Sequence, residues 1–271
     1  MGVLSDRAAE DLSKLRNEKP LIHNITNFVA MNFTANTLLS MGASAVMAHA
    51  EEEVEEMVSS ARALVLNIGT LTGSRLDAML KAGVKAIENG IPVILDPVGS
   101  GATSFRTAAA RRILETVSVS VVRGNASEIL SLRNDNLSTR GVDTIHTVED
   151  AAGTAKTLAK ELRITFAITG PADLVTDGKR VLYVLNGHML MVRVTGIGCA
   201  ATAAIAAFCS VDKDLVTAAA AALAFFGLAG EIAGKKASAP GSFMIHLIDA
   251  LYSITPEMLK NHAKIEDFST P

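Results

Sequence analysis

Residues 194–199 read Val-Thr-Gly-Ile-Gly-Cys and lead directly into the small-residue run Ala-Ala-Thr-Ala-Ala-Ile-Ala-Ala at 200–207. The glycines at 196 and 198 allow the backbone to turn sharply and to approach a ligand closely. The first turn of a following helix offers unpaired N–H groups and the positive end of the helix dipole, where phosphate binds readily. The stretch predicts an anion-binding loop, but on these residues alone a tight loop into a packed helix is an equal alternative.

The composition is that of a soluble globular protein. The chain has 271 residues, of which 49% are hydrophobic and 20% charged, and we expect one domain over residues 1–271. A net charge of −3, with dispersed Lys and Arg, argues against nucleic acid and membrane partners. The two cysteines, Cys199 and Cys209, lack the spacing of a disulfide framework or a zinc site, and the first residues lack a secretory signal pattern. We therefore expect a cytoplasmic protein.

Two apolar blocks, at residues 198–209 and 218–230, could be mistaken for membrane spans. Asp212, Lys213 and Asp214 separate them, and each block is shorter than the roughly 18 residues that a span needs. Their alanine and glycine content allows close approach to a helix, a sheet or a second subunit. We predict that both blocks are buried helices.

Strand-like apolar runs alternate with helical patterns along the chain, which predicts parallel βαβ units. The expected strands span residues 21–23, 43–47, 63–68, 92–96, 120–123 and 165–169. The expected helices span residues 27–41, 51–60, 74–89, 104–117, 126–132 and 148–162, with a helical tail from about residue 242 and a loop or insertion at 133–147. Asp177-Gly178 predicts a hairpin between strands 173–176 and 181–185. The fold class is therefore α/β, a mostly parallel central sheet with helices on both faces and an antiparallel edge hairpin.

In open α/β sheets ligands bind beyond the carboxyl ends of the strands, so the residues that follow the strands are candidates for chemistry. Asp96 ends the predicted central strand, and Glu128 lies in the first turn of the helix after the next strand. Two carboxylates beside an anion loop suggest Mg²⁺ with a polyphosphate. Alternatively, Asp96 could serve as a helix cap or loop acceptor, and Glu128 could complement a helix dipole.

Several motifs occur together and in order. They are Asn67-Ile68-Gly69-Thr70, Asp96-Pro97-Val98-Gly99, Arg123-Gly124-Asn125-Ala126-Ser127-Glu128, Ile168-Thr169-Gly170 and Val194-Thr195-Gly196-Ile197-Gly198-Cys199, preceded by His23-Asn24-Ile25-Thr26-Asn27. In this set the chain resembles the hydroxyethylthiazole kinase family over nearly its whole length. The resemblance implies a ribokinase-like fold and the ATP- and Mg²⁺-dependent phosphorylation of 4-methyl-5-(2-hydroxyethyl)thiazole on its primary hydroxyl, for thiamine biosynthesis or salvage. It also implies a homotrimer with active sites at the subunit interfaces.

The resemblance also implies roles for individual residues. The thiazole would be bound by Met47, Gly196 and Asn27, and the ATP by Arg123, Thr169, Asn125 and Gly170. Asp96 and Glu128 would bind Mg²⁺. The catalytic set would consist of Cys199, Gly198 and Arg123. Ala45 stands where the family often has Pro, and Ile197 where it often has Ala or Thr. The β-branched Ile197 restricts the backbone beside the transferred phosphoryl group.

Cys199 stands where related sugar and vitamin kinases carry an aspartate that can accept the proton of the substrate hydroxyl. A thiol, with a reference pKa of about 8.5, is a poorer base. We expect Cys199 to orient the hydroxyl or to act as a weak base, with a small buried thiol at a helix start as the structural alternative. Two other functions stay open at this point: a kinase for another vitamin precursor, of the hydroxymethylpyrimidine or pyridoxal type, and a non-catalytic ligand sensor.

Overall fold

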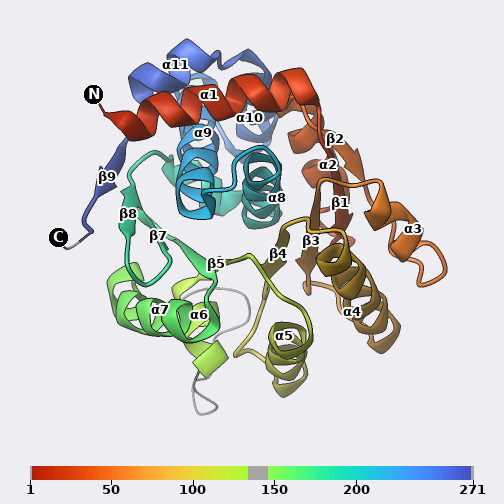
Figure 1. The fold of residues 1–271 in the computed structure, drawn as a ribbon. Coiled ribbons are helices and arrows are strands. Elements are labelled where there is room, and N and C mark those ends of the chain that lie inside the picture. Colours follow the sequence, from red (N-terminus) through yellow and green to blue (C-terminus); the bar gives the residue numbers. More distant parts are fainter. Residues whose placement is uncertain (1, 134–145, 270–271) are drawn as a thin grey trace.

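The computed structural model describes residues 2–133 and 146–269, and within them the strands form one nine-stranded sheet (Figure 1). The strand order is β2-β1-β3-β4-β5-β6-β7-β8-β9. The strands are β1 (Leu21–Ile25), β2 (Ser44–Val46), β3 (Ala63–Asn67), β4 (Val93–Asp96), β5 (Val121–Asn125), β6 (Thr165–Thr169), β7 (Asp173–Thr176), β8 (Val181–Val184) and β9 (Ile265–Asp267). From β2 to β6 every pairing is parallel, whereas β7, β8 and β9 are antiparallel to their neighbours. The predicted fold class and edge hairpin are confirmed.

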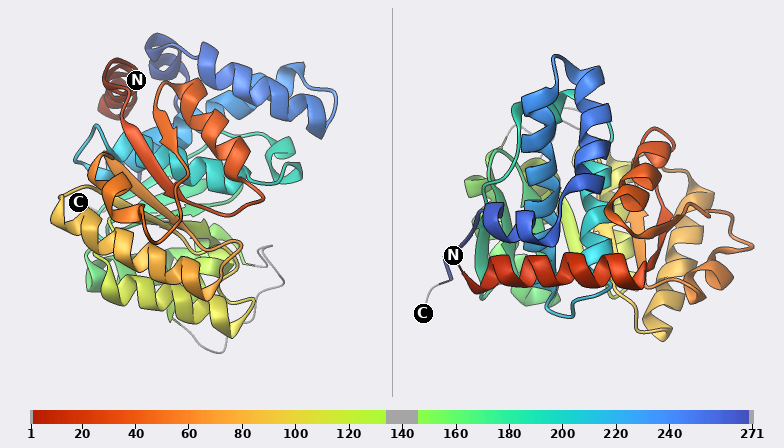
Figure 2. Two further views of the ribbon diagram at one scale, coloured as in Figure 1. Left: turned by 90° about the vertical axis from the view of Figure 1, so that its right-hand side faces the viewer. Right: turned by 90° about the horizontal axis from the view of Figure 1, so that it is seen from above.

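Helices cover both faces of the sheet (Figures 1 and 2). One face carries α1 (Val3–Glu18), α2 (Met31–Met41), α8 (Ile197–Cys209), α9 (Leu215–Lys236), α10 (Pro240–Ser253) and α11 (Pro256–His262). The other carries α3 (Val54–Ser59), α4 (Gly73–Glu88), α5 (Ser104–Thr116), α6 (Ala126–Arg133) and α7 (Val148–Leu162). Every residue of β3 and β4 is buried, as expected for parallel strands covered on both sides.

The two apolar blocks form α8 and α9, which pack against each other on the face of the sheet that also carries α1 and α10. The 22-residue α9 is long and apolar enough to cross a membrane, yet most of it is buried in the core. Close packing explains its small residues: a Cβ at Gly227 would lie 2.5 Å from the carbonyl oxygen of Asn186. The prediction of two buried helices is confirmed.

The ends of the chain differ from the prediction. The amphipathic α1 was not predicted, although Ala8, Leu12 and Leu15 recur at helical spacing and are fully buried. The tail is helical only as far as α11. The three-residue β9 then pairs antiparallel with β8, because the edge of the hairpin offers it unpaired backbone groups. The loop or insertion predicted at 133–147 lies mostly at residues 134–145, outside the described residues.

The segment before α2 also differs, because the predicted helix 27–41 begins only at Met31. The side chain of Asn27 accepts a hydrogen bond from the N–H of Ala30 at 2.9 Å, which holds residues 27–30 in a turn. The strand β1 before it extends to Ile25 rather than ending at residue 23. The turn is therefore placed at the carboxyl edge of the sheet, where the predicted site lies.

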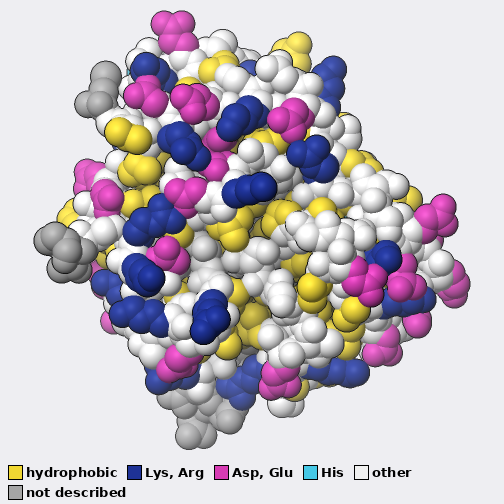
Figure 3. Space-filling model, viewed as in Figure 1, with side chains coloured by type: hydrophobic (Ala, Val, Ile, Leu, Met, Phe, Trp, Pro, Cys, Tyr) yellow, Lys and Arg dark blue, Asp and Glu magenta, His cyan; other side chains and the backbone are white. Residues whose placement is uncertain are grey.

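Charged side chains of both signs share the surface. On the face shown in Figure 3, Lys and Arg side chains are interspersed with Asp and Glu. The described residues include exposed ion pairs, such as Lys260 with Asp6 at 2.7 Å and Lys85 with Glu88 at 2.8 Å. Exposed pairs of this kind contribute little to stability.

Candidate active site

The carboxyl ends of five neighbouring strands, together with the start of α8, bring the predicted site residues to one edge of the sheet. Asn27 follows β1, Asn67 ends β3 and Asp96 ends β4. Arg123 lies in β5 and Thr169 ends β6. Parallel strands present their carboxyl ends at the same edge, so residues up to about 140 positions apart in sequence become neighbours.

The anion loop lies beside an arginine. Gly196 is the N-cap of α8 with φ +83°, a left-handed conformation that favours glycine. A Cβ at Gly198 would lie 2.5 Å from Nη1 of Arg123, so a side chain there would displace the guanidinium. The free N–H groups of the first turn of α8 and the Arg123 guanidinium therefore form one positively polarised surface. Ile197 between the glycines packs against the hydrophobic core.

Asp96 is fully buried, and only one of its carboxylate oxygens is satisfied. Oδ2 accepts hydrogen bonds from Nδ2 of Asn67 at 2.7 Å and from Oγ1 of Thr202 at 2.8 Å. Oδ1 has no partner within the described residues. Burial raises the pKa of Asp96, while the charge of Arg123, whose Nη1 lies 3.9 Å from Oδ2, lowers it. The unsatisfied Oδ1 is a group that a bound cation would complete.

Glu128 lies near Asp96 and braces two loops. Its Oε1 accepts from the N–H of Gly99 and its Oε2 from the N–H of Asn125, each at 2.8 Å. The Oδ1 of Asn125 in turn accepts from the N–H of Glu128 at 2.9 Å, so the Asn125 side chain caps α6. Burial, and then the negative charge of Asp96, raise the pKa of Glu128 to about 7. The loops after β4 and β5 are thus fixed to each other by one carboxylate.

The residue set is compatible with Mg²⁺ bound together with nucleotide phosphates. No group of three or more His, Cys, Asp or Glu side chains within residues 2–133 and 146–269 could hold a metal ion alone. Mg²⁺ is usually bound through one or two carboxylates, several waters and the phosphates of a substrate. Asp96, with its unsatisfied oxygen, and Glu128 beside it supply such carboxylates.

Two of the residues expected to contact ATP also contact each other. The Nη2 of Arg123 donates to Oγ1 of Thr169, which fixes the guanidinium across the ends of β5 and β6. The next residue, Gly170, donates its N–H to Oδ1 of Asp173 at 3.0 Å. Burial raises the pKa of Asp173 to about 7. The sequence predicts Asp173 only as part of the hairpin, whereas the structure places it beside Gly170.

Cys199 is in contact with the turn that follows β1. Its Sγ accepts a hydrogen bond from Nδ2 of Asn27 at 3.1 Å, and the same Nδ2 donates to Oδ1 of Asn67 at 2.9 Å. Burial, and then the charge of Asp96, raise the pKa of the Cys199 thiol to about 11. The thiol is therefore protonated near neutral pH, although it lies in the first turn of a helix.

Two residues of this network had no role in the sequence analysis. Asn67 was quoted only as part of a motif, yet it joins Asn27 to Asp96. Thr202 was quoted only as one of the small residues after the loop, but it lies four residues, or about one helical turn, after Gly198 and so faces the same side as the glycine loop. That spacing was the available signal.

Met47 directly follows β2, which is the edge strand of the sheet. Arg123 lies in β5, four strands further along the sheet. Its carbonyl oxygen lies 3.2 Å from Nδ1 of His49, whose ring meets that of Phe28 edge-on, with 5.7 Å between centroids. A Cβ at Gly196 would lie 3.1 Å from the Cβ of Ala30, so the start of α8 also contacts the turn after β1. Asn27, Met47 and Gly196 are thus connected through these segments.

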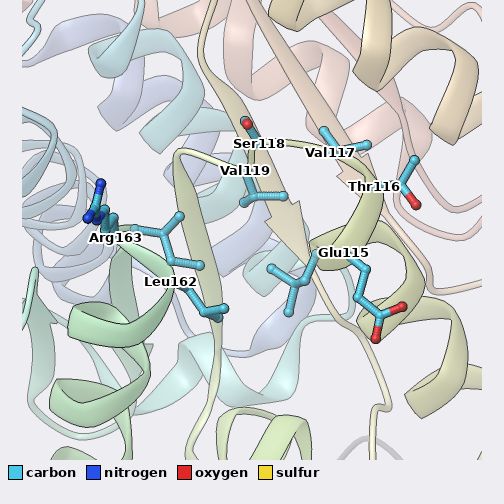
Figure 4. A pocket seen from close by; sticks show the side chains of 9 residues that line it. Glu115, Thr116, Val117, Ser118, Val119, Leu162 and Arg163 are labelled. Carbon is cyan, nitrogen blue, oxygen red and sulfur yellow. The ribbon is translucent and has the colours of Figure 1, made fainter.

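A separate hollow lies at the opposite edge of the sheet (Figure 4). Glu115 and Thr116 approach it from the end of α5, and Leu162 and Arg163 from the end of α7. Its other lining residues precede β5 and β6. It contains no residue of the network described above.

Comparison with known proteins identifies the family. The sequence pattern of the hydroxyethylthiazole kinase family matches residues 12–257. The chain belongs to the hydroxyethylthiazole kinase family. It is 61% identical over 269 residues to the hydroxyethylthiazole kinase of Desulfotalea psychrophila, a match that covers 99% of this chain and 98% of that protein. The resemblance inferred from the ordered motifs, including the kinase class, is therefore confirmed.

Two solved structures extend the comparison to the fold. The hydroxyethylthiazole kinase protein from Pyrococcus horikoshii superposes with a TM-score of 0.89 at 45% identity, covering 96% of this chain and 98% of that one. A ribokinase-like superfamily protein from Enterococcus faecalis superposes with a TM-score of 0.66 at 12% identity, over 92% and 95% of the two chains. The fold is ribokinase-like, as predicted.

Proposed function

We propose that this kinase transfers the γ-phosphoryl group of ATP, with Mg²⁺, to the primary hydroxyl of 4-methyl-5-(2-hydroxyethyl)thiazole, in thiamine biosynthesis or salvage. The observation that carries the proposal is the position of Arg123. Its guanidinium lies between Thr169, the Asp96 carboxylate and the Gly198 turn at the positive end of α8. Phosphoryl transfer depends mainly on positioning and on neutralising the charge of the phosphoryl oxygens, and this arrangement supplies both.

Each side of the site has its own task in this proposal. Arg123, Thr169, Asn125 and Gly170 bind the ATP, with the N–H groups of Gly198 and Cys199 facing the transferred group. Asp96 and Glu128 hold Mg²⁺, which would neutralise phosphate charge when bound. Asn27, Met47 and Gly196 bind the thiazole. The division follows the topology, since the residues proposed for ATP come from β5 and β6 and those for thiazole from the ends of β1 and β2 and the N-cap of α8.

Cys199 orients the substrate hydroxyl in this scheme and does not act as a strong base. With a pKa of about 11 the thiol keeps its proton near neutral pH. Its Sγ and the Asn27 amide nevertheless give a donor and an acceptor beside the nucleophile. A loose phosphoryl-transfer transition state places little charge on the attacking oxygen, so removal of the hydroxyl proton can follow bond formation.

We also propose a homotrimer whose active sites lie at subunit interfaces. Large apolar side chains are exposed on α2, on α10 and on the short 3₁₀ helix η1 (Met189–Arg193), which pack against one another through α10. They are Leu39, Met189, Val192, Met244, Ile245 and Tyr252, with Phe28 and Val29 on the turn before α2. Exposed apolar surface of this kind is typical of protein interfaces.

The two cysteines are unpaired, which supports a reducing, cytoplasmic location.

The test is Mg²⁺-dependent ADP release from ATP in the presence of the thiazole alcohol, with hydroxymethylpyrimidine and pyridoxal as competing acceptors. We expect release with the thiazole alcohol, and its loss in Gly198→Asp, which places a carboxylate in the anion loop. Preference for pyridoxal or hydroxymethylpyrimidine would contradict the proposed substrate. Binding of ATP without release in any of the three mixtures would favour a ligand sensor.

A further inference from the structure

Arg75 is a buried cation that has no carboxylate beside it. It lies in the first turn of α4 with 6% of its surface exposed, and within the described residues no acidic side chain comes within ion-pair distance of it. Burial lowers its pKa. The positive end of the α4 dipole disfavours a cation at this position as well. Both effects oppose a guanidinium here, so its remaining contacts indicate why it is present.

Those contacts fall on the two neighbours of Asn27. The Nη2 of Arg75 donates to the carbonyl oxygen of Thr26. The guanidinium carbon lies 4.3 Å from the centroid of the Phe28 ring, within the range of a cation–π interaction. Arg75 thus holds the turn after β1 at both sides of Asn27, whose Nδ2 donates to the Cys199 sulfur.

The Asn27 side chain has little room to move. Its Nδ2 serves both Asn67 and Cys199, and a Cβ on Gly69 would lie only 2.7 Å from its Cβ. A rotation of the turn would therefore change the distance from Nδ2 to Sγ. Because hydrogen bonds weaken steeply with distance and misalignment, a small displacement would remove this contact.

Phe28 connects the same guanidinium to the second thiazole-side segment. One side of its ring faces Arg75, and the His49 ring meets it edge-on, with an interplanar angle of 86°. His49 Nδ1 in turn lies 3.2 Å from the carbonyl oxygen of Met47. Asn27 and Met47, which belong to different loops, thus share one support.

We propose that Arg75 is a positioning residue for the hydroxyl side of the site: it holds the turn at residues 26–28 so that the Asn27 carboxamide meets Cys199, and it supports the Met47 loop through Phe28. The role in catalysis rests on the proposed function. The role in holding Asn27 against Cys199 does not, and it can be measured without any substrate.

The substrate-free test is alkylation of Cys199 by iodoacetamide, followed by peptide mass spectrometry, in wild type, Arg75→Met, Asn27→Ala and the double variant. We expect each single variant to change the alkylation rate by at least about threefold. The double variant should match Asn27→Ala, because both substitutions remove the same contact, that between Asn27 Nδ2 and Cys199 Sγ. An unchanged rate in Arg75→Met, or effects that multiply in the double variant, would overturn the proposal.

The matched control is Arg16→Met. Arg16 is also a partly buried arginine whose guanidinium donates to backbone carbonyls, but these belong to Met41 at the end of α2 and to Leu251 and Tyr252 at the end of α10. Its loss should lower stability and leave Cys199 alkylation unchanged. Arg75→Lys keeps the cation and one donor, so it should restore part of the wild-type rate, and it serves as the test variant if Arg75→Met does not fold.

The catalytic test separates the two substrates. In steady-state kinetics Arg75→Met should lower kcat/KM for the thiazole alcohol by roughly tenfold to a hundredfold, as a displaced site residue does, with KM for ATP within about twofold of wild type. A rise in KM for ATP as large as the rise in KM for the thiazole alcohol would mean that Arg75 supports the fold alone. A wild-type protein that does not phosphorylate the thiazole alcohol would refute the proposed function and leave the alkylation result valid.

Discussion

The side-chain amide of Asn27 donates to the sulfur of Cys199 over 3.1 Å, joining the turn after β1 to the first turn of α8. The two residues are 172 positions apart, and their contact places a neutral donor beside a thiol of raised pKa. Of the two roles considered for Cys199, this geometry favours orientation of the hydroxyl over removal of its proton.

Replacing Cys199 by aspartate tests whether a proton acceptor at this position assists the transfer. A carboxylate is ionised at neutral pH more readily than a thiol with a pKa of about 11, and Asn27 would still donate to it. We expect Cys199→Asp to retain or increase kcat with the thiazole alcohol. Steady-state kinetics at pH about 7.5 would measure the change. The control is Cys199→Ser, in which a hydroxyl replaces the thiol as donor and acceptor without adding a base. A folded Cys199→Asp variant without activity would contradict a proton-accepting role at this position.

Gly198 is expected to tolerate no side chain. A methyl group there would meet Nη1 of Arg123 at 2.5 Å and displace the guanidinium from Thr169 and Asp96. Gly198→Ala should therefore lower kcat by about a hundredfold or more, since loss of one positioned donor costs about that much. Gly153→Ala in α7 is the control, because a Cβ there has no neighbour within 4 Å and alanine favours the helix. Equal activity of the two variants would show that Arg123 can move without consequence.

Asp96 is expected to be essential for activity and unfavourable for stability. Burial raises its pKa, and Oδ1 has no partner within the described residues, so ionisation of Asp96 in the folded chain leaves an incompletely compensated charge. The raised pKa means that this group favours folding below the pKa of the unfolded chain, and that the contribution is lost as pH rises through the folded pKa. Asp96→Asn should abolish ADP release and leave the free energy of unfolding at pH about 8 equal or higher. A less stable variant would indicate that the Arg123 charge outweighs the cost of burial.

Much of the fold followed from the sequence because parallel strands buried on both faces leave uninterrupted apolar runs, as in β3 and β4. The site followed in part, since Asp96, Arg123 and Thr169 occupy strand ends, where topology alone brings them together. Short or irregular elements such as β9 and η1 carry too little pattern to be predicted. Asn67, Thr202 and Arg75 were missed for a different reason: their importance lies in contacts across 29 to 106 positions, which no local pattern encodes.

The proposed trimer predicts that apolar side chains on α10 are buried between subunits. Ile245 is 60% exposed in the single chain and belongs to the apolar set defined above. Ile245→Glu should reduce the mass in solution, measured by light scattering, from about three times 28.4 kDa toward that of one chain, because a charge at an interface core is costly. Activity should fall with it if the sites need a second subunit. Ile87→Glu, at an exposed position of α4 in the far layer, is the matched change from isoleucine to glutamate that should leave the mass unaltered.

Asp11 provides a test of stability far from the proposed chemistry. It lies in α1, is fully buried, and neither of its oxygens has a hydrogen-bond partner within the described residues. Burial, and then the charge of Asp212, raise its pKa from 3.8 to about 7. Arg7 donates to Asp212 at 2.7 Å and, with Lys14, opposes the shift only in part. A protonated Asp11 can donate to the Asp212 carboxylate, so the pair is best satisfied when it holds one proton.

The sign of the pH dependence follows from that shift. Below about pH 4 both the folded and the unfolded chain hold the Asp11 proton, whereas between about pH 4 and 7 only the folded chain holds it, so this group's contribution to stability declines as pH rises. Asp11→Asn keeps a donor toward Asp212 without a charge. We expect it to exceed wild type in free energy of unfolding by about 2 kcal/mol at pH 8, and the difference to vanish near pH 4, in urea titrations at both pH values. A constant offset for Asp11→Asn at both pH values would disprove the shared proton.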